Sequence, residues 1–381
     1  MRVLLASSSS GSRGGGEIFL LTLAEQLAKL GHAPWLWASN HSRMNELCDR
    51  FESFGPVHRF PYQNTYDRRS RVIGALLDRP AARRVAHHWQ SLGPDIVHLN
   101  KQNLEDGLDL VAAAHTAGLP GVMTLHVTQS ARQLGARFGG LRDFVTRSLL
   151  ESYPGILVAI GRSRLADLQG FLNGSQRTRL VENGVPIPAT GERESWRREI
   201  RQKLGVNASD LLGIGVGRMV EQKRPALFLS LGEQLGRRIP HSRFVWVGGG
   251  PLEEWWQAEL KRRGLDQQIA TTGWVANPHP YYAAADFFLH TAHFEGLPLA
   301  LLEGASWGLP IAVTPNLYAD LDFLPELGAL VADADKPDWS DPLADPDKRE
   351  KLGSRARALV ISRFSSERMA KNYLDLYHEA Q

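Results

Sequence analysis

Short apolar runs alternate along the whole chain with longer segments whose apolar positions recur at helical spacing. This alternation is typical of βα units, which form parallel sheets covered by helices. The expected strands are 2–6, 33–38, 96–99, 121–125 and 155–160 in the first half, and 211–216, 243–247, 287–289 and 310–313 in the second. The first expected helix covers 17–30 and ends at Gly31. The pattern therefore predicts an α/β protein with two doubly wound, Rossmann-like sheets.

Turn-forming residues between the two groups of strands predict a domain boundary. The segment 183–188 reads Asn-Gly-Val-Pro-Ile-Pro and precedes a charged helix. The chain has 381 residues, which fits two domains of about 180 residues each. We expect an N-terminal, acceptor-side domain over 1–186, a C-terminal domain over 187–361, and a helix over 362–381 that returns to the N-terminal domain. Open parallel sheets bind ligands beyond the carboxyl ends of their strands, so two facing domains predict a cleft between them.

Composition narrows the class of protein. Apolar residues make up 43% and charged residues 22% of the chain, and no apolar run approaches the roughly 20 residues of a membrane span. The single cysteine, Cys48, excludes a disulfide framework and a multi-thiolate metal site. Because the apolar stretch 3–6 is also too short for a signal peptide, we expect a cytoplasmic protein. The net charge of +3 is modest and no recognition motif is present, so nucleic acid is not an expected partner.

A glycine-rich loop follows the first expected strand and opens the first helix. It contains Gly11, Gly14, Gly15 and Gly16, but not at the G-x-G-x-x-G spacing of dinucleotide-binding proteins. Free backbone amides at a helix N-terminus favour an anion, so a phosphate or sugar contact is predicted. The alternative is a tight turn without a ligand.

A second loop, after the strand 211–216, contains Gly217, Arg218, Lys223 and Arg224. A planar guanidinium together with a compact ammonium suits a diphosphate. Charge runs are more usually solvated faces, and only the position at a strand's carboxyl end favours a binding site.

Two glutamates belong to the segment 294–308, whose Pro298 suits the start of a helix that ends near Gly308. Glu295 precedes this helix, and Glu303 lies inside it among leucines. A carboxylate in apolar surroundings needs a partner, and ribose hydroxyls are one candidate for Glu303. The alternatives are a structural carboxylate bonded to backbone at Glu303 and a complement to the helix N-terminus at Glu295.

The order and spacing of these residues resemble the retaining GT-B glycosyltransferases of family 4, also called glycosyl transferases group 1. The resemblance rests first on Gly217-Arg218 with Lys223, and on Glu295 and Glu303. Further matching segments are 14–17, 181–185, 247–251, 273–275, 282–286 and 363–367. It covers nearly the whole chain and implies two facing Rossmann-like domains.

The resemblance also implies a role for each matching residue. Arg218 and Lys223 would bind the donor diphosphate and stabilise the leaving group, as catalytic residues together with Glu295 and His126. Glu295 would bind hydroxyls of the transferred sugar, which His126 would face, and Glu303 would bind the ribose. Donor-binding glycines would be Gly217, Gly248 and Gly249 in the second domain and Gly15 and Gly16 in the first. The donor would be a UDP- or GDP-sugar, with no further cofactor.

The expected chemistry is electrostatic. Departure of a nucleoside diphosphate places negative charge on its oxygens, which fixed cations stabilise without reorganising. The three Asp-x-Asp pairs, at 320/322, 333/335 and 345/347, do not end apolar strands, and we interpret them as solvated loop carboxylates. No metal is therefore expected. The resemblance implies retention of anomeric configuration by same-face attack, not the two-carboxylate mechanism of glycosidases.

Some residues differ from the family pattern, and the sequence does not identify the acceptor. Residues 314–321 replace the family's usual glycine pair and glutamate, Gly304 replaces an alanine, and Arg224 replaces a glycine. The acceptor, a lipid, a glycan or a small molecule, would meet the N-terminal domain. The competing hypotheses are a sugar-nucleotide epimerase or hydrolase, and a non-catalytic nucleotide-sugar binder, which the changed segment 314–321 would suit.

Two basic amphipathic clusters in the N-terminal domain suggest peripheral contact with anionic lipid. The first consists of Arg68, Arg69, Arg71, Arg79, Arg83 and Arg84 with Val72, Ile73, Leu76, Leu77 and Val85. The second consists of Arg132, Arg137, Arg142 and Arg147 with Leu134, Phe138, Leu141 and Phe144. Solvated helix faces are the more common explanation of such clusters.

Overall fold

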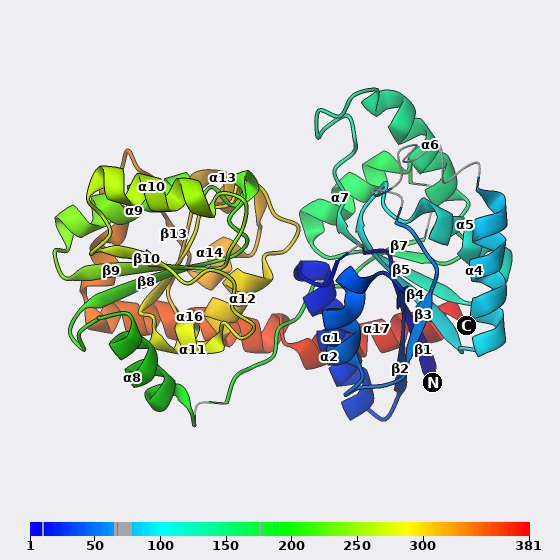
Figure 1. The fold of residues 1–381 in the computed structure, drawn as a ribbon, viewed down its shortest axis with the longest axis horizontal. Coiled ribbons are helices and arrows are strands. Elements are labelled where there is room, and N and C mark those ends of the chain that lie inside the picture. Colours follow the sequence, from blue (N-terminus) through cyan, green and yellow to red (C-terminus); the bar gives the residue numbers. More distant parts are fainter. Residues whose placement is uncertain (10, 65–66, 68–77, 175–176, 190) are drawn as a thin grey trace. The chain divides into compact units, whose positions relative to one another are not determined.

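The computed structural model describes residues 1–9, 11–64, 67, 78–174, 177–189 and 191–381. The chain forms two compact units: unit 1 is Met1–Gly184 together with Ser366–Gln381, and unit 2 is Val185–Ser365. Each is a Rossmann-like α/β domain with a parallel sheet, which confirms the predicted fold class (Figure 1). The cleft between the domains stays a prediction. In the described residues, no helix is both long enough and apolar enough to cross a membrane.

The sheet of unit 1 has the strand order β3-β2-β1-β4-β5-β6-β7, with every described pairing parallel. Its strands are β1 (Arg2–Ser7), β2 (Ala33–Ser39), β3 (Val57–Phe60), β4 (Ile96–Asn103), β5 (Gly121–Val127), β6 (Ile156–Ala159) and β7 (Thr178–Leu180). Among its described residues the α-helices are α1 (Gly15–Lys29), α2 (Asn45–Phe51), α4 (Arg79–Leu92), α5 (Leu108–Ala117), α6 (Gly139–Glu151), α7 (Arg162–Phe171) and α17 (Ser366–Ala380).

Alternating residues of the central strand β1 fill two separate cores, one on each face of the sheet. Val3 and Leu5 pack in the core that α1, α2 and α17 cover. Leu4 and Ala6 pack in the core that α4, α5 and α7 cover. Because successive strand side chains point to opposite faces, a strand covered on both faces has a continuous apolar run, which here is Val3 to Ala6.

The last helix of the chain, α17, belongs to unit 1 and is bonded to its sheet through a buried polar chain. The Tyr377 hydroxyl lies 2.6 Å from Nδ1 of His98, and Nε2 of His98 lies 2.8 Å from the Thr124 hydroxyl. Thr124 in turn lies 2.7 Å from the Tyr373 hydroxyl. Burial lowers the pKa of His98 to about 3, so this ring is neutral at physiological pH. The residues at the chain's end are therefore part of the N-terminal core.

The sheet of unit 2 has the order β10-β9-β8-β11-β12-β13. Its strands are β8 (Leu211–Val216), β9 (Ser242–Val247), β10 (Ile269–Thr271), β11 (Phe287–His290), β12 (Ile311–Val313) and β13 (Leu330–Val331). Its α-helices are α8 (Arg193–Lys203), α9 (Pro225–Arg238), α10 (Glu253–Arg263), α11 (His279–Ala284), α12 (Leu299–Ser306), α13 (Pro315–Asp320), α14 (Leu324–Leu327), α15 (Asp341–Ala344) and α16 (Pro346–Arg363).

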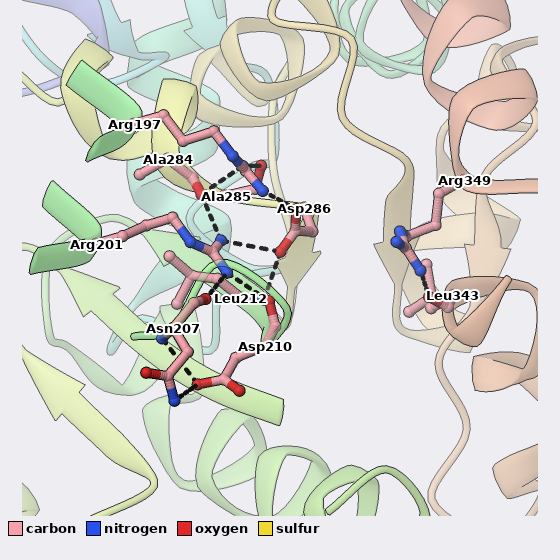
Figure 2. A network of polar contacts seen from close by, with 10 residues as sticks. All are labelled: Arg197, Arg201, Asn207, Asp210, Leu212, Ala284, Ala285, Asp286, Leu343 and Arg349. Carbon is pink, nitrogen blue, oxygen red and sulfur yellow. Dashed lines mark hydrogen bonds and ion pairs between the residues drawn. The ribbon is translucent and has the colours of Figure 1, made fainter. Parts of the chain in front are cut away.

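A network of charged groups on α8 fixes the amino ends of β8 and β11 (Figure 2). Arg197 and Arg201 both pair with Asp286, at 2.7 and 3.1 Å, and both donate to the Ala284 carbonyl oxygen. The second carboxylate oxygen of Asp286 accepts from the Leu212 amide at 2.7 Å. This carboxylate therefore joins the two strands where they begin.

All nine strands predicted from the sequence are present, and β3, β7, β10 and β13 were not predicted. These four lie at the edges of the two sheets.

Candidate functional site

Glycines bring the loops after β8 and β9 into contact at the carboxyl edge of the unit 2 sheet. The Gly217 amide donates to the Val247 carbonyl oxygen at 3.0 Å, and the Met219 amide donates to the Gly249 carbonyl oxygen at 2.9 Å. Gly248 has φ 136°, and a Cβ atom there would lie 2.1 Å from the Gly217 carbonyl oxygen. Only glycine fits at this position. The predicted residues Gly217, Gly248 and Gly249 are thus neighbours.

The predicted cation Lys223 forms an ion pair with the predicted carboxylate Glu295, through Nζ and Oε1. Lys223 ends a short 3₁₀ turn (Glu221–Lys223) after β8, whereas Glu295 follows β11. Two bonds join these loops: the Thr291 hydroxyl donates to the Lys223 carbonyl oxygen at 2.8 Å, and the His293 amide donates to that of Gln222 at 2.7 Å. The structure therefore brings together two side chains that stand 72 positions apart in the chain.

His290, the last residue of β11, also holds Glu295 and was not predicted as a site residue. Its Nε2 lies 3.1 Å from Oε1 of Glu295. Burial lowers the pKa of His290, although its bond to Glu295 opposes this, so the ring is neutral and Nε2 carries the proton that the carboxylate accepts. Burial alone would raise the pKa of Glu295, but the Lys223 charge and the His290 bond outweigh it and hold that pKa at about 2. Glu295 is therefore ionised at neutral pH.

Arg218 differs from Lys223 in its surroundings. Its side chain is exposed and makes no hydrogen bond or ion pair with any residue that the structure describes. A guanidinium in this state can donate its full set of N–H groups to an incoming anion.

The carboxylate of Glu303 on α12, the second predicted one, has one hydrogen-bond partner among the described residues. The Tyr282 hydroxyl on α11 donates to its Oε2 at 2.8 Å. Burial raises the pKa of Glu303 to about 7, which the Tyr282 bond partly offsets. The Phe288 ring lies between the two ring side chains that hold the carboxylates, with centroids 6.0 Å from Tyr282 and 5.7 Å from His290. Sequence reasoning gave Tyr282 no role.

Gly304, which departs from the family pattern, lies against this aromatic row. A Cβ atom there would lie 3.1 Å from the Phe288 ring, closer than ordinary van der Waals contact. The glycine therefore lets α12 approach β11 closely.

Replacing Glu303 with glutamine is expected to stabilise the ligand-free protein at alkaline pH. A carboxyl whose folded pKa is raised contributes stability below its unfolded pKa, near 4.5, and loses it as the pH rises through 7. Since glutamine keeps the neutral form at every pH, E303Q should exceed the wild type by about 1–3 kcal/mol at pH 8. The difference should shrink towards pH 5, which urea unfolding at both pH values measures. An equal difference at both would contradict the raised pKa.

In unit 1 the structure brings the predicted site residues Gly15, Gly16 and His126 together at the carboxyl edge of the sheet. His126, near the end of β5, lies 2.7 Å from the amide oxygen of Asn100, whose Nδ2 donates to the Gly16 carbonyl oxygen at 3.1 Å. Gly15 and Gly16 are the first residues of α1, and no side chain in the described part caps this helix. Burial lowers the pKa of His126 to about 4, so the ring is neutral and Nε2–H donates to Asn100. Asn100 was not predicted.

Two further groups of residues were singled out from the sequence: the Asp-x-Asp pairs and the segment 314–321, which differs from the family pattern. Asp345 caps α16 by accepting from the amides of Asp347 and Lys348. Asp333 accepts from the Asp335 amide at 3.0 Å. Among the described residues, no group of three or more His, Cys, Asp or Glu side chains could hold a metal ion. In the departing segment, Thr314 precedes α13 and is buried, and its hydroxyl has no partner in the described residues.

Comparison with known proteins defines the class. The family model described as Glycosyltransferase Family 4 matches residues 13–187, and that described as Glycosyl transferases group 1 matches residues 212–344. The chain belongs to this family of glycosyltransferases, whose GT-B fold the two Rossmann-like domains represent.

Individual relatives are distant. The 2-deoxystreptamine N-acetyl-D-glucosaminyltransferase of Niallia circulans is 29% identical over 182 residues, which cover 44% of this chain and 46% of that protein. The alpha-monoglucosyldiacylglycerol synthase of Acholeplasma laidlawii is 22% identical over 313 residues, or 77% and 75%. The chain spans about half the length of the first curated relatives it matches. The crystal structure of Anabaena Alr3699/HepE in complex with UDP has a TM-score of 0.77 at 19% identity, with full coverage of both chains, and shows the same fold.

Proposed function

We propose that this protein is a retaining glycosyltransferase that moves a sugar from a UDP- or GDP-sugar to an acceptor without a metal ion. The observation that carries the proposal is the cluster of Lys223, Glu295 and His290 beside the glycine loops of unit 2. It places a cation and an ionised carboxylate at the carboxyl edge of the sheet, where parallel α/β domains bind ligands. Membership of the family supports the reaction class.

In the proposed reaction, cations stabilise the departing nucleoside diphosphate. Arg218 is unpaired within the described residues and would bind phosphate oxygens with its planar fork. Lys223 has three N–H donors, so it can keep its contact with Glu295 while it donates to phosphate. As the glycosidic bond breaks, the charge that grows on the diphosphate is met by groups already in place. This stabilisation would take the part that a metal ion plays in other transferases.

The carboxylates would orient the donor through its hydroxyl groups. Glu295, ionised and held by Lys223 and His290, accepts hydrogen bonds from the transferred sugar. Glu303 donates or accepts through Oε1, because Tyr282 occupies only Oε2. We assign the ribose hydroxyls to Glu303, since its pKa near 7 allows both roles at neutral pH.

For unit 1 we propose that the amides of Gly15 and Gly16 bind phosphate oxygens, because a helix N-terminus favours an anion. Nε2 of His126 is bonded to Asn100, which leaves Nδ1 as an acceptor for a sugar hydroxyl. The same-face mechanism gives the acceptor's proton to the leaving phosphate, so no further base is assigned.

The donor and the acceptor follow from relatives only by analogy. HepE of Anabaena has been crystallised with UDP and with UDP-glucose, which supports a UDP-sugar. The Acholeplasma relative is named for a diacylglycerol glycolipid, which supports a lipid among the possible acceptors. We include in the proposal a cytoplasmic location and peripheral contact of the N-terminal domain with a membrane.

A thermal-shift panel with EDTA present tests the donor and the absence of a metal together. UDP-, GDP- and ADP-sugars are added singly, and a ligand at a hundred times its Kd should stabilise the fold by about 2.7 kcal/mol. At least one donor is expected to raise the Tm. Absence of a shift with every donor in EDTA, together with a shift in Mg²⁺, would contradict the metal-free proposal.

The same panel separates the competing functions. A stabilising donor that is then consumed only when a lipid, glycan or small-molecule fraction is added indicates transfer. Consumption without an acceptor would indicate a hydrolase or an epimerase, and a shift without any consumption would indicate a binding protein.

A further inference from the structure

Four large apolar side chains lie exposed on one short segment of unit 1. Leu134, Phe138, Leu141 and Phe144 expose 49, 69, 61 and 69% of their surface, and we call them the α6 surface. Within the described part of unit 1 they are the large apolar side chains that remain exposed; the others of the chain, Trp255, Trp274 and Ile361, belong to unit 2. Such a grouping is a mark of an interaction site, whereas single exposed apolar residues are ordinary.

The loop that carries Leu134 and Phe138 is a closed, hydrogen-bonded turn. The Leu134 amide donates to the Ser130 carbonyl oxygen at 3.0 Å, and the Gly139 amide donates to that of Ala136 at 3.0 Å. The Asp143 carboxylate accepts from the amides at 131 and 132, at 2.8 and 3.2 Å. The two side chains are therefore held outward by a built loop.

Phe138 adopts a backbone conformation that favours glycine. Its φ is 58°, in the left-handed region, where a bulky side chain is disfavoured. Gly139 follows, and a Cβ atom there would lie 2.7 Å from the Arg132 Cα atom, so the turn tolerates no side chain at that position. An aromatic ring that is both exposed and held in a strained conformation indicates a function for that ring.

Charge distinguishes the kind of partner. Arg132 and Arg137 are exposed and make no ion pair with the described residues, and the Arg137 guanidinium lies 5.1 Å from the Phe138 ring centroid. The Asp143 carboxylate accepts hydrogen bonds from backbone amides, and the sequence has no other acidic residue between positions 130 and 150. An apolar surface bordered by arginines that have no ion-pair partner among the described residues complements the acyl chains and phosphates of anionic lipids.

The structure corrects the predicted arginine cluster here. Arg142 forms two bonds to Glu105, at 2.7 and 2.6 Å, and the Arg147 guanidinium lies 5.2 Å from the Phe171 ring centroid. Neither belongs to the α6 surface, because both arginines face partners within unit 1. Of the other predicted cluster, the following lie outside the described residues: Arg68, Arg69, Arg71, Val72, Ile73, Leu76 and Leu77.

We infer that the α6 surface docks unit 1 on an anionic lipid bilayer, with its four apolar side chains in the interfacial layer and Arg132 and Arg137 at the headgroup phosphates. The segment before α6 projects from unit 1 (Figure 1) and follows β5, so it lies at the same edge of the sheet as His126 and the glycine loop. A bilayer at this edge would present lipid acceptors to unit 1. This inference rests on the proposed function, because it names the surface and the lipid of the peripheral membrane contact proposed there.

Vesicle flotation tests the docking directly. The full chain is mixed with vesicles of phosphatidylglycerol and phosphatidylcholine in equal parts, or of phosphatidylcholine alone. We expect flotation with the anionic vesicles, weakened by salt, and a loss of at least about tenfold in the partition coefficient for the double variant F138S/F144S. The matched control is W255S/I361S, which removes two exposed apolar side chains from unit 2 and should float as the wild type does.

A fluorescent label locates the contact. Cys48 is buried, so a cysteine placed at Phe138 reacts selectively with an environment-sensitive dye. The dye at F138C should shift to the blue with anionic vesicles, and the dye at I361C should not.

Wild-type flotation by F138S/F144S would overturn the inference. So would a wild-type dimer that the variant dissociates while neither protein floats, which would make the surface a contact between two copies. The donor thermal shift of F138S/F144S reports whether the variant is folded. A retained donor shift with no flotation of the wild type removes the membrane contact and leaves the proposed sugar transfer standing, whereas flotation without any donor shift removes the proposed sugar transfer and leaves the docking standing.

Discussion

Replacing Lys223 with methionine is expected to lower turnover by about a thousandfold, because the variant loses a fixed cation at the departing diphosphate. The change also leaves the buried Glu295 carboxylate with His290 as its remaining partner in the described part of the chain, so the pKa of Glu295 should rise from about 2. Breaking a buried pair by removing one member costs several kcal/mol, so the Tm should fall as well. Steady-state kinetics, donor titration and thermal unfolding measure the three effects.

A matched variant separates the local effect from a general loss of lysine. Lys348 on α16 is 64% exposed and lies near Asp345 at 3.7 Å, so K348M should leave turnover and Tm nearly unchanged. If K223M retained wild-type turnover and donor affinity, Lys223 would not contact the donor and the site assignment would be wrong.

Replacing Glu295 with glutamine is expected to reduce kcat by about a hundredfold while donor affinity changes little. Glutamine keeps an oxygen that can accept from Lys223 and His290, so the cluster should stay folded. What is lost is the negative charge beside the sugar, which matters most as positive charge develops on the anomeric carbon. Kinetics at saturating donor give kcat, and the donor thermal shift gives the affinity.

The pH dependence of this variant supplies an independent check. A carboxylate with a depressed pKa contributes stability above its unfolded pKa, near 4.5, and loses it as the pH falls towards 2. The wild type should therefore lose its stability advantage over E295Q only in that acid range. The exposed Glu350→Gln serves as the control, and equal kcat in E295Q and the wild type would refute the role of the charge.

The interior strands of both sheets could be predicted because they are covered on two faces, which requires continuous apolar runs such as 2–6 and 211–216. The strands that sequence reasoning missed are the edge strands. β3 (Val57–Phe60) is only partly buried throughout, and β13 (Leu330–Val331) has two residues. An edge strand has one neighbour and less cover, so its residues carry no strong apolar signal.

The individual site residues were named from the sequence, whereas their partners were not. Lys223 and Glu295 belong to loops at the carboxyl ends of β8 and β11, which strand order makes neighbours only in the folded sheet. The partners are buried polar residues within elements whose sequence is mainly apolar: His290, Tyr282 and Asn100. A polar residue at the carboxyl end of an expected strand was the available signal for His290.

The arginines before and within α6 illustrate a further limit of sequence reasoning. The four arginines recur at intervals of five residues among apolar residues. Yet Arg142 binds Glu105, whereas Arg132 does not pair with a described residue. Glu105 stands 37 positions earlier, in the turn before α5, so the pairing depends on the packing of α5 against α6.

The position of α17 bears on how the protein is made. The first 184 residues leave the ribosome long before Tyr373 and Tyr377 are added. These two tyrosines complete the core of unit 1. Until then His98 and Thr124 lack the hydroxyl groups that they bond in the finished protein. The second unit, continuous from Val185 to Ser365, has its whole sequence available earlier. The first unit to be translated therefore obtains its last core helix only after the whole of the second unit has been translated.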